Sequence, residues 1–134
     1  MNFSWPIRVY YEDTDSGGVV YHSNYLNFLE RCRTEFLRHL GFEQDRLKND
    51  NNILFAVRSI KLDFHKPARF NELLDVTAEV SQIKKASLLF EQKIIRPSDQ
   101  QLLCQASVLI ACLTADGFKP RALPDAFREA LSVD

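Results

Sequence analysis

Residues 25–40 of the chain read YLNFLERCRTEFLRHL and carry its strongest structural signal. Apolar side chains recur there every three or four residues, at Tyr25, Leu29, Cys32, Phe36 and Leu40. This period places them on one face of an amphipathic α-helix of four or five turns. Ser23 or Asn24 can cap the start of such a helix, and Gly41 suits the position just past its end.

Most of the remaining chain alternates between apolar and polar residues in the manner of β-strands. We expect strands at residues 3–11, 53–64, 74–83, 87–96 and 102–114, and a short final helix at residues 124–131. Consecutive strands with short connections indicate an antiparallel sheet that packs one face on the long helix, an α+β fold. The strand at 102–114 is apolar on both faces and is expected in the middle of the sheet. The face away from the helix then meets either solvent or a second subunit, and the apolar content of residues 102–113 favours a second subunit.

Length and composition are those of an ordinary globular protein. The 134 residues fit a single domain, assigned to residues 1–134, and 46% are apolar while 26% are charged. A net charge of −1 gives no electrostatic basis for binding nucleic acid. The longest apolar runs hold about five residues, against roughly 20 for a membrane-spanning helix, so we expect no transmembrane segment. The first residues lack the pattern of a signal peptide, and we expect a cytoplasmic protein.

The cysteines and the common catalytic motifs give no sign of a metal or a cofactor. Cys32, Cys104 and Cys112 are widely spaced and show no metal-ligand spacing. We interpret them as small buried apolar residues. Nucleophile-elbow, phosphate-loop, dinucleotide-binding and paired-histidine motifs do not occur in the sequence.

The segment that joins the first strand to the long helix is the best candidate for a site. It places Asp13 and Asp15 in a loop, followed by Gly17 and Gly18, which allow a tight turn and close approach of a ligand. The helix start adds free N–H groups and the positive end of the helix dipole. A carboxylate beside an oxyanion-binding site is what attack on an acyl carbonyl requires. Such loops also occur as plain helix caps, so the residues alone leave a structural role open.

A family resemblance narrows the choice. Residues 11–25 fit the pattern Y-x-D-T-D-x-x-G-x-V-x-x-x-x-Y, which resembles the signature of hotdog thioesterases similar to 4-hydroxybenzoyl-CoA thioesterase. The wider context, RVYYEDTD at 8–15, ERCRTE at 30–35 and KPRALP at 119–124, resembles the YbgC-type acyl-CoA thioesterases. Those enzymes are associated with the Tol-Pal envelope system of Gram-negative bacteria. The resemblance covers essentially the whole chain, and no motif position departs from it.

The resemblance implies a hotdog fold, in which an antiparallel sheet of about five strands wraps one long helix. It implies a homodimer with active sites at the interface, and dimers of this family often pair into a homotetramer. The implied reaction is hydrolysis of acyl-CoA, with short to medium acyl groups, to free acid and CoA without a cofactor. Acyl carrier protein is an alternative donor or partner.

By the same resemblance, Asp15 matches the catalytic carboxylate, acting as general base or as nucleophile. The main-chain N–H of His22 matches the oxyanion donor, and the His22 side chain either orients the reactants or supports residues that do. Gly18 allows the thioester to approach the loop. Asp13 is expected to be structural, with its carboxylate accepting loop N–H groups.

The phosphates of CoA need cations, and we assign Arg58, Lys85 and Ser87 to substrate binding. Family members tend to place CoA contacts at the start of the strand that holds Ser87. A solvated basic turn is the simpler alternative for these residues. Tyr25 is the last residue of the signature, and we assign it to substrate binding as well. It is also the first residue of the apolar helix stripe, which fits a place in the core.

Two other functions fit the same residues. A hotdog dehydratase or hydratase pairs a His with an acid, and His22 lies close to Asp15 in sequence. A non-catalytic scaffold that binds acyl thioesters or acyl carrier protein is the main alternative, because a fold does not imply an activity. Release of free thiol from an acyl-CoA separates hydrolysis from both.

Overall fold

The computed structural model describes residues 2–131; Met1 and residues 132–134 of the expected domain lie outside the described residues. The elements in chain order are β1 (Asn2–Arg8), η1 (Tyr11–Asp13), α1 (Asn24–His39), α2 (Gln44–Asn51), β2 (Leu54–Phe64), β3 (Leu73–Ile83), β4 (Ser87–Arg96), β5 (Gln101–Leu113) and α3 (Asp125–Leu131). The α+β fold class is confirmed.

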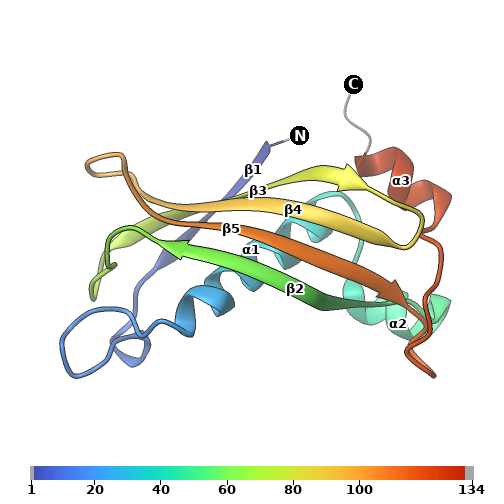
Figure 1. Cartoon of the computed structure of the whole chain (residues 1–134), viewed down its shortest axis with the longest axis horizontal. Helices are drawn as coiled ribbons and strands as arrows, with labels where there is room; N and C mark the ends of the chain where they lie inside the picture. The colour runs from blue at the N-terminus through green and yellow to red at the C-terminus, as the bar shows by residue number, and fades with distance from the viewer. Residues whose placement is uncertain (1, 132–134) are drawn as a thin grey trace.

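The five strands form one antiparallel sheet in the order β1-β3-β4-β5-β2. The predicted interior position of β5 is therefore confirmed, and β1 and β2 are the edges. α1 runs along one face of this sheet, while α2 and α3 both lie at one end of the molecule (Figure 1). The loop between β1 and α1 lies at the opposite end. The loop that carries the candidate site is therefore separated from the two short helices by the length of the sheet.

The predicted helix and four of the predicted strands lie within a residue or so of the observed ones. Gly41 follows α1 with φ of +96°, and its N–H donates to the Arg38 carbonyl at 2.9 Å, as expected for a helix end. The first strand was predicted too long, because the chain leaves the sheet after Arg8. α2 was not predicted at all. None of its residues is buried, so it has no apolar stripe from which a helical period could be recognised.

α1 and the sheet enclose the core. Phe28, Leu29, Cys32 and Phe36 on α1 are almost fully buried, as are inward-facing residues on the three interior strands. The cysteines are buried, as predicted. Burial raises the pKa of the Cys32 thiol to about 12, and the Cys32 Sγ donates to the Val76 carbonyl at 3.2 Å. Such a thiol is a packing group rather than a nucleophile.

A buried polar pair ties α1 to the middle of the sheet. Nη1 of Arg33 donates to Oε1 of Gln92 at 3.0 Å, and Nε2 of Gln92 donates to the Leu29 carbonyl at 3.1 Å. Arg33 is 8% exposed and Gln92 1%. Desolvation of the guanidinium lowers the pKa of Arg33. The pair therefore holds α1 at one position along β4, because sliding would leave a buried charge without its partner.

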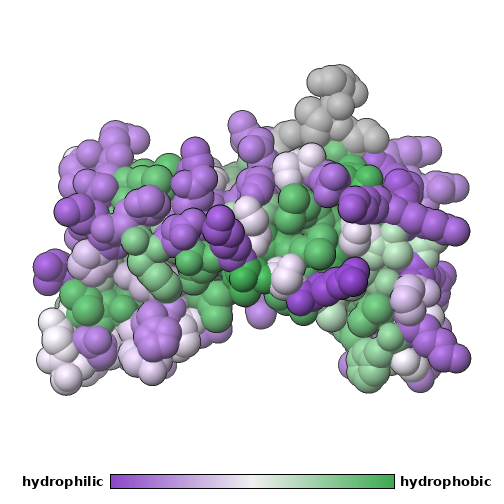
Figure 2. All heavy atoms as spheres, viewed as in Figure 1, coloured by the Kyte–Doolittle hydropathy of each residue, from purple (hydrophilic) through white to green (hydrophobic). Residues whose placement is uncertain are grey.

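The edge strand β2 carries apolar residues that α1 covers only in part. Val57, Ile60 and Phe64 pair with Ile110, Val108 and Cys104, which face the core, yet the three remain 39–52% exposed. The sheet face that points away from α1 is more mixed. Figure 2 shows apolar atoms across the middle of the molecule between hydrophilic clusters. Glu91 and Ser107 form a hydrogen-bonded pair on neighbouring strands. The strongest signal for a partner is thus the edge strand rather than the sheet face.

The Arg33–Gln92 pair yields a stability prediction. Replacing Gln92 with Ala leaves the Arg33 guanidinium buried without an acceptor, so we expect the free energy of unfolding to fall by about 2–4 kcal/mol. The double variant Arg33→Met, Gln92→Leu removes both polar groups and should recover most of that loss. Urea unfolding followed by circular dichroism measures both. A double variant no more stable than Gln92→Ala would contradict the proposed anchor.

Candidate active site at the start of the long helix

The loop between β1 and α1 folds back on itself around Asp15. Thr14 and Val20 form an antiparallel bridge, and the Asp15 N–H donates to the Val19 carbonyl at 2.9 Å. The Gly18 N–H closes the turn by donating to the Asp15 carbonyl at 3.1 Å. Gly18 has φ of +80°, a conformation that side chains with a Cβ avoid. The glycine therefore makes this tight turn, as the sequence predicted.

The Asp15 side chain stands exposed in this turn with one oxygen bound and one free. Oδ1 accepts the Gly17 N–H at 2.7 Å, whereas Oδ2 accepts no hydrogen bond from residues 2–131. The carboxylate lines a surface hollow of about 510 Å³ together with Tyr11 and Phe70, whose rings meet edge to face at 5.8 Å. A carboxylate held by one N–H and open on its other oxygen can accept a proton or attack a carbon.

Asp13 does the structural work expected of it, with different partners. It is buried, and its two oxygens accept the Tyr10 N–H at 2.8 Å and Nδ2 of Asn24 at 3.0 Å. Its own carbonyl accepts the Tyr21 N–H at 2.9 Å. Asp13 thus links the residue before the loop to the first turn of α1. This fastens the loop to the helix from which the oxyanion site would come.

The start of α1 leaves main-chain donors open. Ser23 occupies the cap position, but its side chain makes no capping hydrogen bond, and the Asn24 side chain is engaged with Asp13. The His22 N–H has no acceptor among the described residues. The His22 ring is exposed and lies 4.3 Å from that of Tyr21. An uncapped helix start with free N–H groups can bind an oxyanion.

Tyr25 lies inside the protein rather than on an exposed binding surface of the single chain. The side chain is 3% exposed, and its hydroxyl accepts the Ala68 N–H at 3.0 Å. The Ala68 carbonyl in turn accepts the Val20 N–H at 2.8 Å. Burial raises the pKa of Tyr25. Tyr25 therefore fastens the turn at Ala68 to both the loop and the helix; a direct contact with substrate stays a prediction.

Sequence reasoning missed that turn, which adds Phe70 to the Asp15 hollow. Val19 bridges to Arg69, and the Arg69 N–H donates to Glu72 at 2.8 Å. Arg96 on β4 pairs with Glu72 at 3.0 Å and so anchors the turn to the sheet. An isolated Phe three residues after Pro67 was a weak signal by itself. Its contribution depends on the fold, which brings residues 68–70 beside residues 19–20.

The predicted CoA-binding residues form a second group at the other end of the sheet. Arg58 and Ser87 line a hollow of about 450 Å³ with Phe118, and Lys85 lies exposed two residues before Ser87. None of the three predicted residues lines the Asp15 hollow of the same chain. Asp15 lies close to the Phe64 end of β2, since Phe64 contacts Tyr25, whereas Arg58 lies toward the Leu54 end. One chain thus holds the Asp15 hollow and the Arg58 hollow apart from each other.

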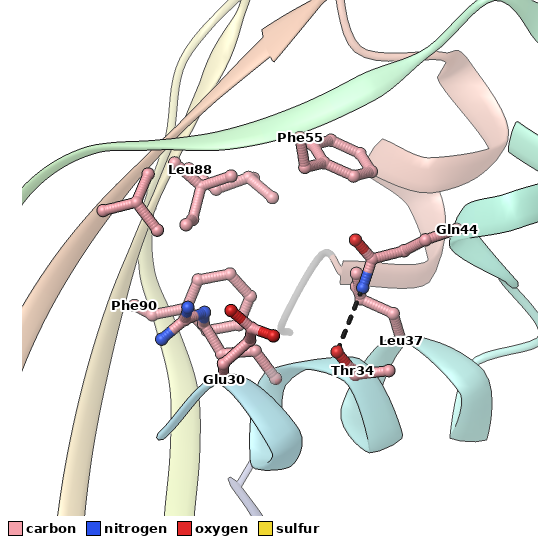
Figure 3. A pocket seen from close by; sticks show the side chains of 10 residues that line it. Glu30, Thr34, Leu37, Gln44, Phe55, Leu88 and Phe90 are labelled. Atoms are coloured by element: carbon pink, nitrogen blue, oxygen red, sulfur yellow. Dashed lines mark hydrogen bonds between the residues drawn. The ribbon is translucent and has the colours of Figure 1, made fainter. Parts of the chain in front are cut away.

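A third hollow of about 270 Å³ lies between α1 and the sheet (Figure 3). Leu37, Phe55, Leu88 and Phe90 provide apolar walls, and Glu30 points toward the space from α1. Nε2 of Gln44 donates to Oγ1 of Thr34 at 3.2 Å along its helical side (Figure 3). This hollow opens beside the exposed edge strand. Its lining was not predicted from the sequence.

Within residues 2–131, no cluster of three or more His, Cys, Asp or Glu side chains is arranged to hold a metal ion. No helix in this part of the chain is long and apolar enough to cross a membrane.

Comparison with known proteins shows the family to which the chain belongs. A model of the thioesterase-like superfamily matches residues 9–131. An acyl-CoA thioesterase YbgC from Haemophilus influenzae is 45% identical over 128 residues, covering 96% of this chain and 93% of that protein. A probable thioesterase from Bartonella henselae has a solved structure with a TM-score of 0.87 and 37% identity, covering 92% of this chain and all of that one. A 1,4-dihydroxy-2-naphthoyl-CoA thioesterase from Synechocystis, at 22% identity over 98% of this chain and 96% of that one, has a TM-score of 0.91 and supports the fold alone.

One long helix packed on a five-stranded antiparallel sheet is the architecture of the hotdog thioesterases. The chain belongs to the thioesterase-like superfamily and, within it, to the YbgC acyl-CoA thioesterases. The family resemblance of the sequence and the predicted hotdog fold are thereby confirmed.

The turn at Gly18 yields a second prediction. A Cβ at Gly18 would meet no atom within 4 Å, so the cost of Gly18→Ala comes from the left-handed backbone alone. We expect a loss of about 1–2 kcal/mol in the free energy of unfolding. Gly117→Ala is the matched control, because its φ is not in the left-handed region and its Cβ contacts are ordinary. Equal thermal stability of the two variants would refute the strained turn.

Proposed function

We propose that the chain hydrolyses acyl-CoA thioesters with Asp15 as the catalytic carboxylate. The observation that carries the proposal is the free Oδ2 of Asp15 in a loop that is tied to the uncapped start of α1. The membership of the YbgC acyl-CoA thioesterases supplies the reaction class. A pure scaffold needs neither an open carboxylate nor a strained glycine turn beside it.

In the proposed mechanism, the thioester carbonyl oxygen accepts the His22 N–H at the positive end of α1. Asp15 removes a proton from a water molecule, which attacks the carbonyl carbon. The His22 N–H and the helix dipole stabilise the negative charge that develops on the oxygen. The tetrahedral intermediate then expels the CoA thiolate, which takes up a proton, and the free acid remains. Attack by Asp15 itself, through an anhydride that water then hydrolyses, uses the same geometry.

We further propose that a complete site needs two chains. Half of β2 separates Arg58 from the Phe64 end, and at about 3.3 Å per residue this is roughly 20 Å. Antiparallel pairing of the two β2 edges about a two-fold axis would bring the Phe64 end of one chain beside the Leu54 end of the other. The exposed apolar residues of β2 support such a homodimer. Pairing of dimers into a homotetramer is a further step that we propose on family grounds.

The hollow between α1 and β2 has a volume of about 270 Å³, just below the usual range of ligand pockets, which begins at about 300 Å³. A space of this size suits a short to medium acyl group. Acyl carrier protein remains an alternative donor. A cytoplasmic location and an association with the Tol-Pal system are proposed from the family resemblance.

The decisive experiment replaces Asp15 with Asn and measures thiol release from a panel of acyl-CoAs. The change is nearly isosteric and removes the base, so we expect kcat to fall at least ~100-fold. Asp116→Asn, an exposed acid in the turn after β5, is the matched control and should keep full activity. Equal rates for wild type and folded Asp15→Asn would make Asp15 structural. Tight acyl-CoA binding without turnover by wild type would favour the scaffold.

The two-chain site is tested by Ile60→Lys on β2. A charge at this inward-facing edge position should block pairing of the edges while leaving the chain folded, because Ile60 is already 39% exposed. We expect a monomer by light scattering and loss of most thioesterase activity. Leu73→Lys is the control, since Leu73 is 41% exposed on β3, away from β2. A monomeric variant with full activity would show that one chain suffices.

A further inference from the structure

The hollow of Figure 3 has walls of two kinds. Its sheet side is apolar, with Phe55 on β2 and with Leu88 and Phe90 on β4. Its helix side combines Leu37 with polar residues of α1, and Gln44 at the start of α2 adds an amide. An alkyl chain gains free energy by covering apolar walls, but it loses free energy wherever it buries a polar group that has no hydrogen-bond partner. The position of the polar groups therefore decides how far such a chain can run.

A contact between Gln44 and Thr34 closes one side of this space. Nε2 of Gln44 donates to Oγ1 of Thr34 at 3.2 Å, so the amide connects α2 to α1 (Figure 3). Oε1 of Gln44 accepts no hydrogen bond from residues 2–131. A methyl group placed against this oxygen would bury it without a partner, which is unfavourable. The pair thus forms a polar end to a path that is apolar on its sheet side.

The segments on either side of α2 hold Gln44 in this position. Gly41, which separates α1 from α2, has a φ of +96°. After α2, Asn52 has a φ of +56°, and its Oδ1 accepts the N–H groups of Ala115 and Asp116 at 2.8 and 3.1 Å. No residue of α2 is buried, so its place depends on these connections rather than on its own packing. A change of the Gln44 side chain therefore alters the hollow and leaves the core intact.

Gln44 also lies well away from the proposed chemistry. At about 1.5 Å per residue, Thr34 lies roughly 15 Å along α1 from Asn24, the first residue of the helix. An acetyl group whose carbonyl lies at the helix start does not extend that far. A longer acyl group that runs along α1 reaches the pair of Gln44 and Thr34. Any effect of Gln44 on the substrate should therefore depend on acyl length.

We propose that Gln44 sets the upper length of the acyl group that this hollow accepts. The proposal rests on the proposed function, in which the hollow holds the acyl group, and it names a specificity-determining residue. Acyl chains that end before Gln44 gain from the apolar walls with each added methylene. Longer chains must break the contact between Gln44 and Thr34 and cover the amide. A single methylene in a pocket changes kcat/KM by about 10-fold or more, so activity should fall sharply beyond one length.

The test measures kcat/KM for straight-chain acyl-CoAs of increasing length. Gln44→Ala shortens the side chain and removes the amide, so we expect kcat/KM to rise about 10-fold for acyl groups just above the wild-type limit. Gln44→Trp fills more of the hollow and should move the limit to shorter acyl groups. Hydrolysis of acetyl-CoA should stay unchanged in both variants, because the acetyl group does not reach Gln44.

Lys48→Ala is the matched control for the length profile. Lys48 is exposed on the same helix and is not part of the lining of the hollow, so this variant should keep the profile of wild type. The proposal is wrong if Gln44→Ala keeps the wild-type profile. It is also wrong if Gln44→Ala changes kcat/KM by the same factor at every length, acetyl-CoA included, because a general structural effect would act in that way.

A binding measurement separates this inference from the proposed function. S-alkyl-CoA thioethers have no carbonyl to hydrolyse, so calorimetric titration with a series of them requires no turnover, and thermal unfolding verifies that each variant is folded. The longest alkyl chain bound without loss of affinity should increase in Gln44→Ala and decrease in Gln44→Trp, even if wild type hydrolyses no thioester. The same limit in wild type and in both variants rejects the role of Gln44 even if Asp15 proves catalytic.

Discussion

One α-helix cannot cover a five-stranded sheet. A helix with its side chains is about 10 Å across, whereas five strands spaced about 4.8 Å apart make a wider surface. α1 packs mainly toward β1 and β3, so the core side of β2 stays open. The exposed apolar residues of β2 and the hollow of Figure 3 both result from this mismatch. The need for a partner on the edge strand, and with it the proposed two-chain site, depends on the same constraint.

Buried hydrogen bonds decide how the helix and its loop sit on the sheet. Gln92 holds Arg33 in the middle of α1, while Asp13 holds Asn24 at its start. The Ala68 N–H donates to the Tyr25 hydroxyl, and the Ala68 carbonyl accepts the Val20 N–H. An unpaired buried polar group is costly in free energy, so these hydrogen bonds fix the positions of the helix and the loop on the sheet. Apolar packing alone would not fix them. They set the position of Asp15 relative to the first turn of α1.

The two half-sites divide the proposed work between chemistry and recognition. The half-site near Asp15 offers an open carboxylate and free helix N–H groups, which suit the reacting carbonyl. The residues near Arg58 offer a cation, which suits the phosphates of the proposed CoA substrate. Such a division would allow the CoA part of the substrate to be recognised without constraining the geometry of the reaction.

The sequence by itself determined the periodic elements and the motif loop. The apolar stripe of α1, the alternation of the strands and Gly41 are local patterns, so they could be read without the fold. The loop with Asp15 and Gly18 was recognised because its carboxylate and the glycine of its left-handed turn lie within a few residues of each other in the sequence. α2 was not predicted because none of its residues is buried, and its sequence therefore has no apolar period. The placing of Phe70 beside Asp15, the hollow that brings Arg58 to Ser87 and the uncovered face of β2 were decided by tertiary structure. Each depends on which distant segments become neighbours, and strand order and helix coverage are properties of the whole packed chain rather than of any segment.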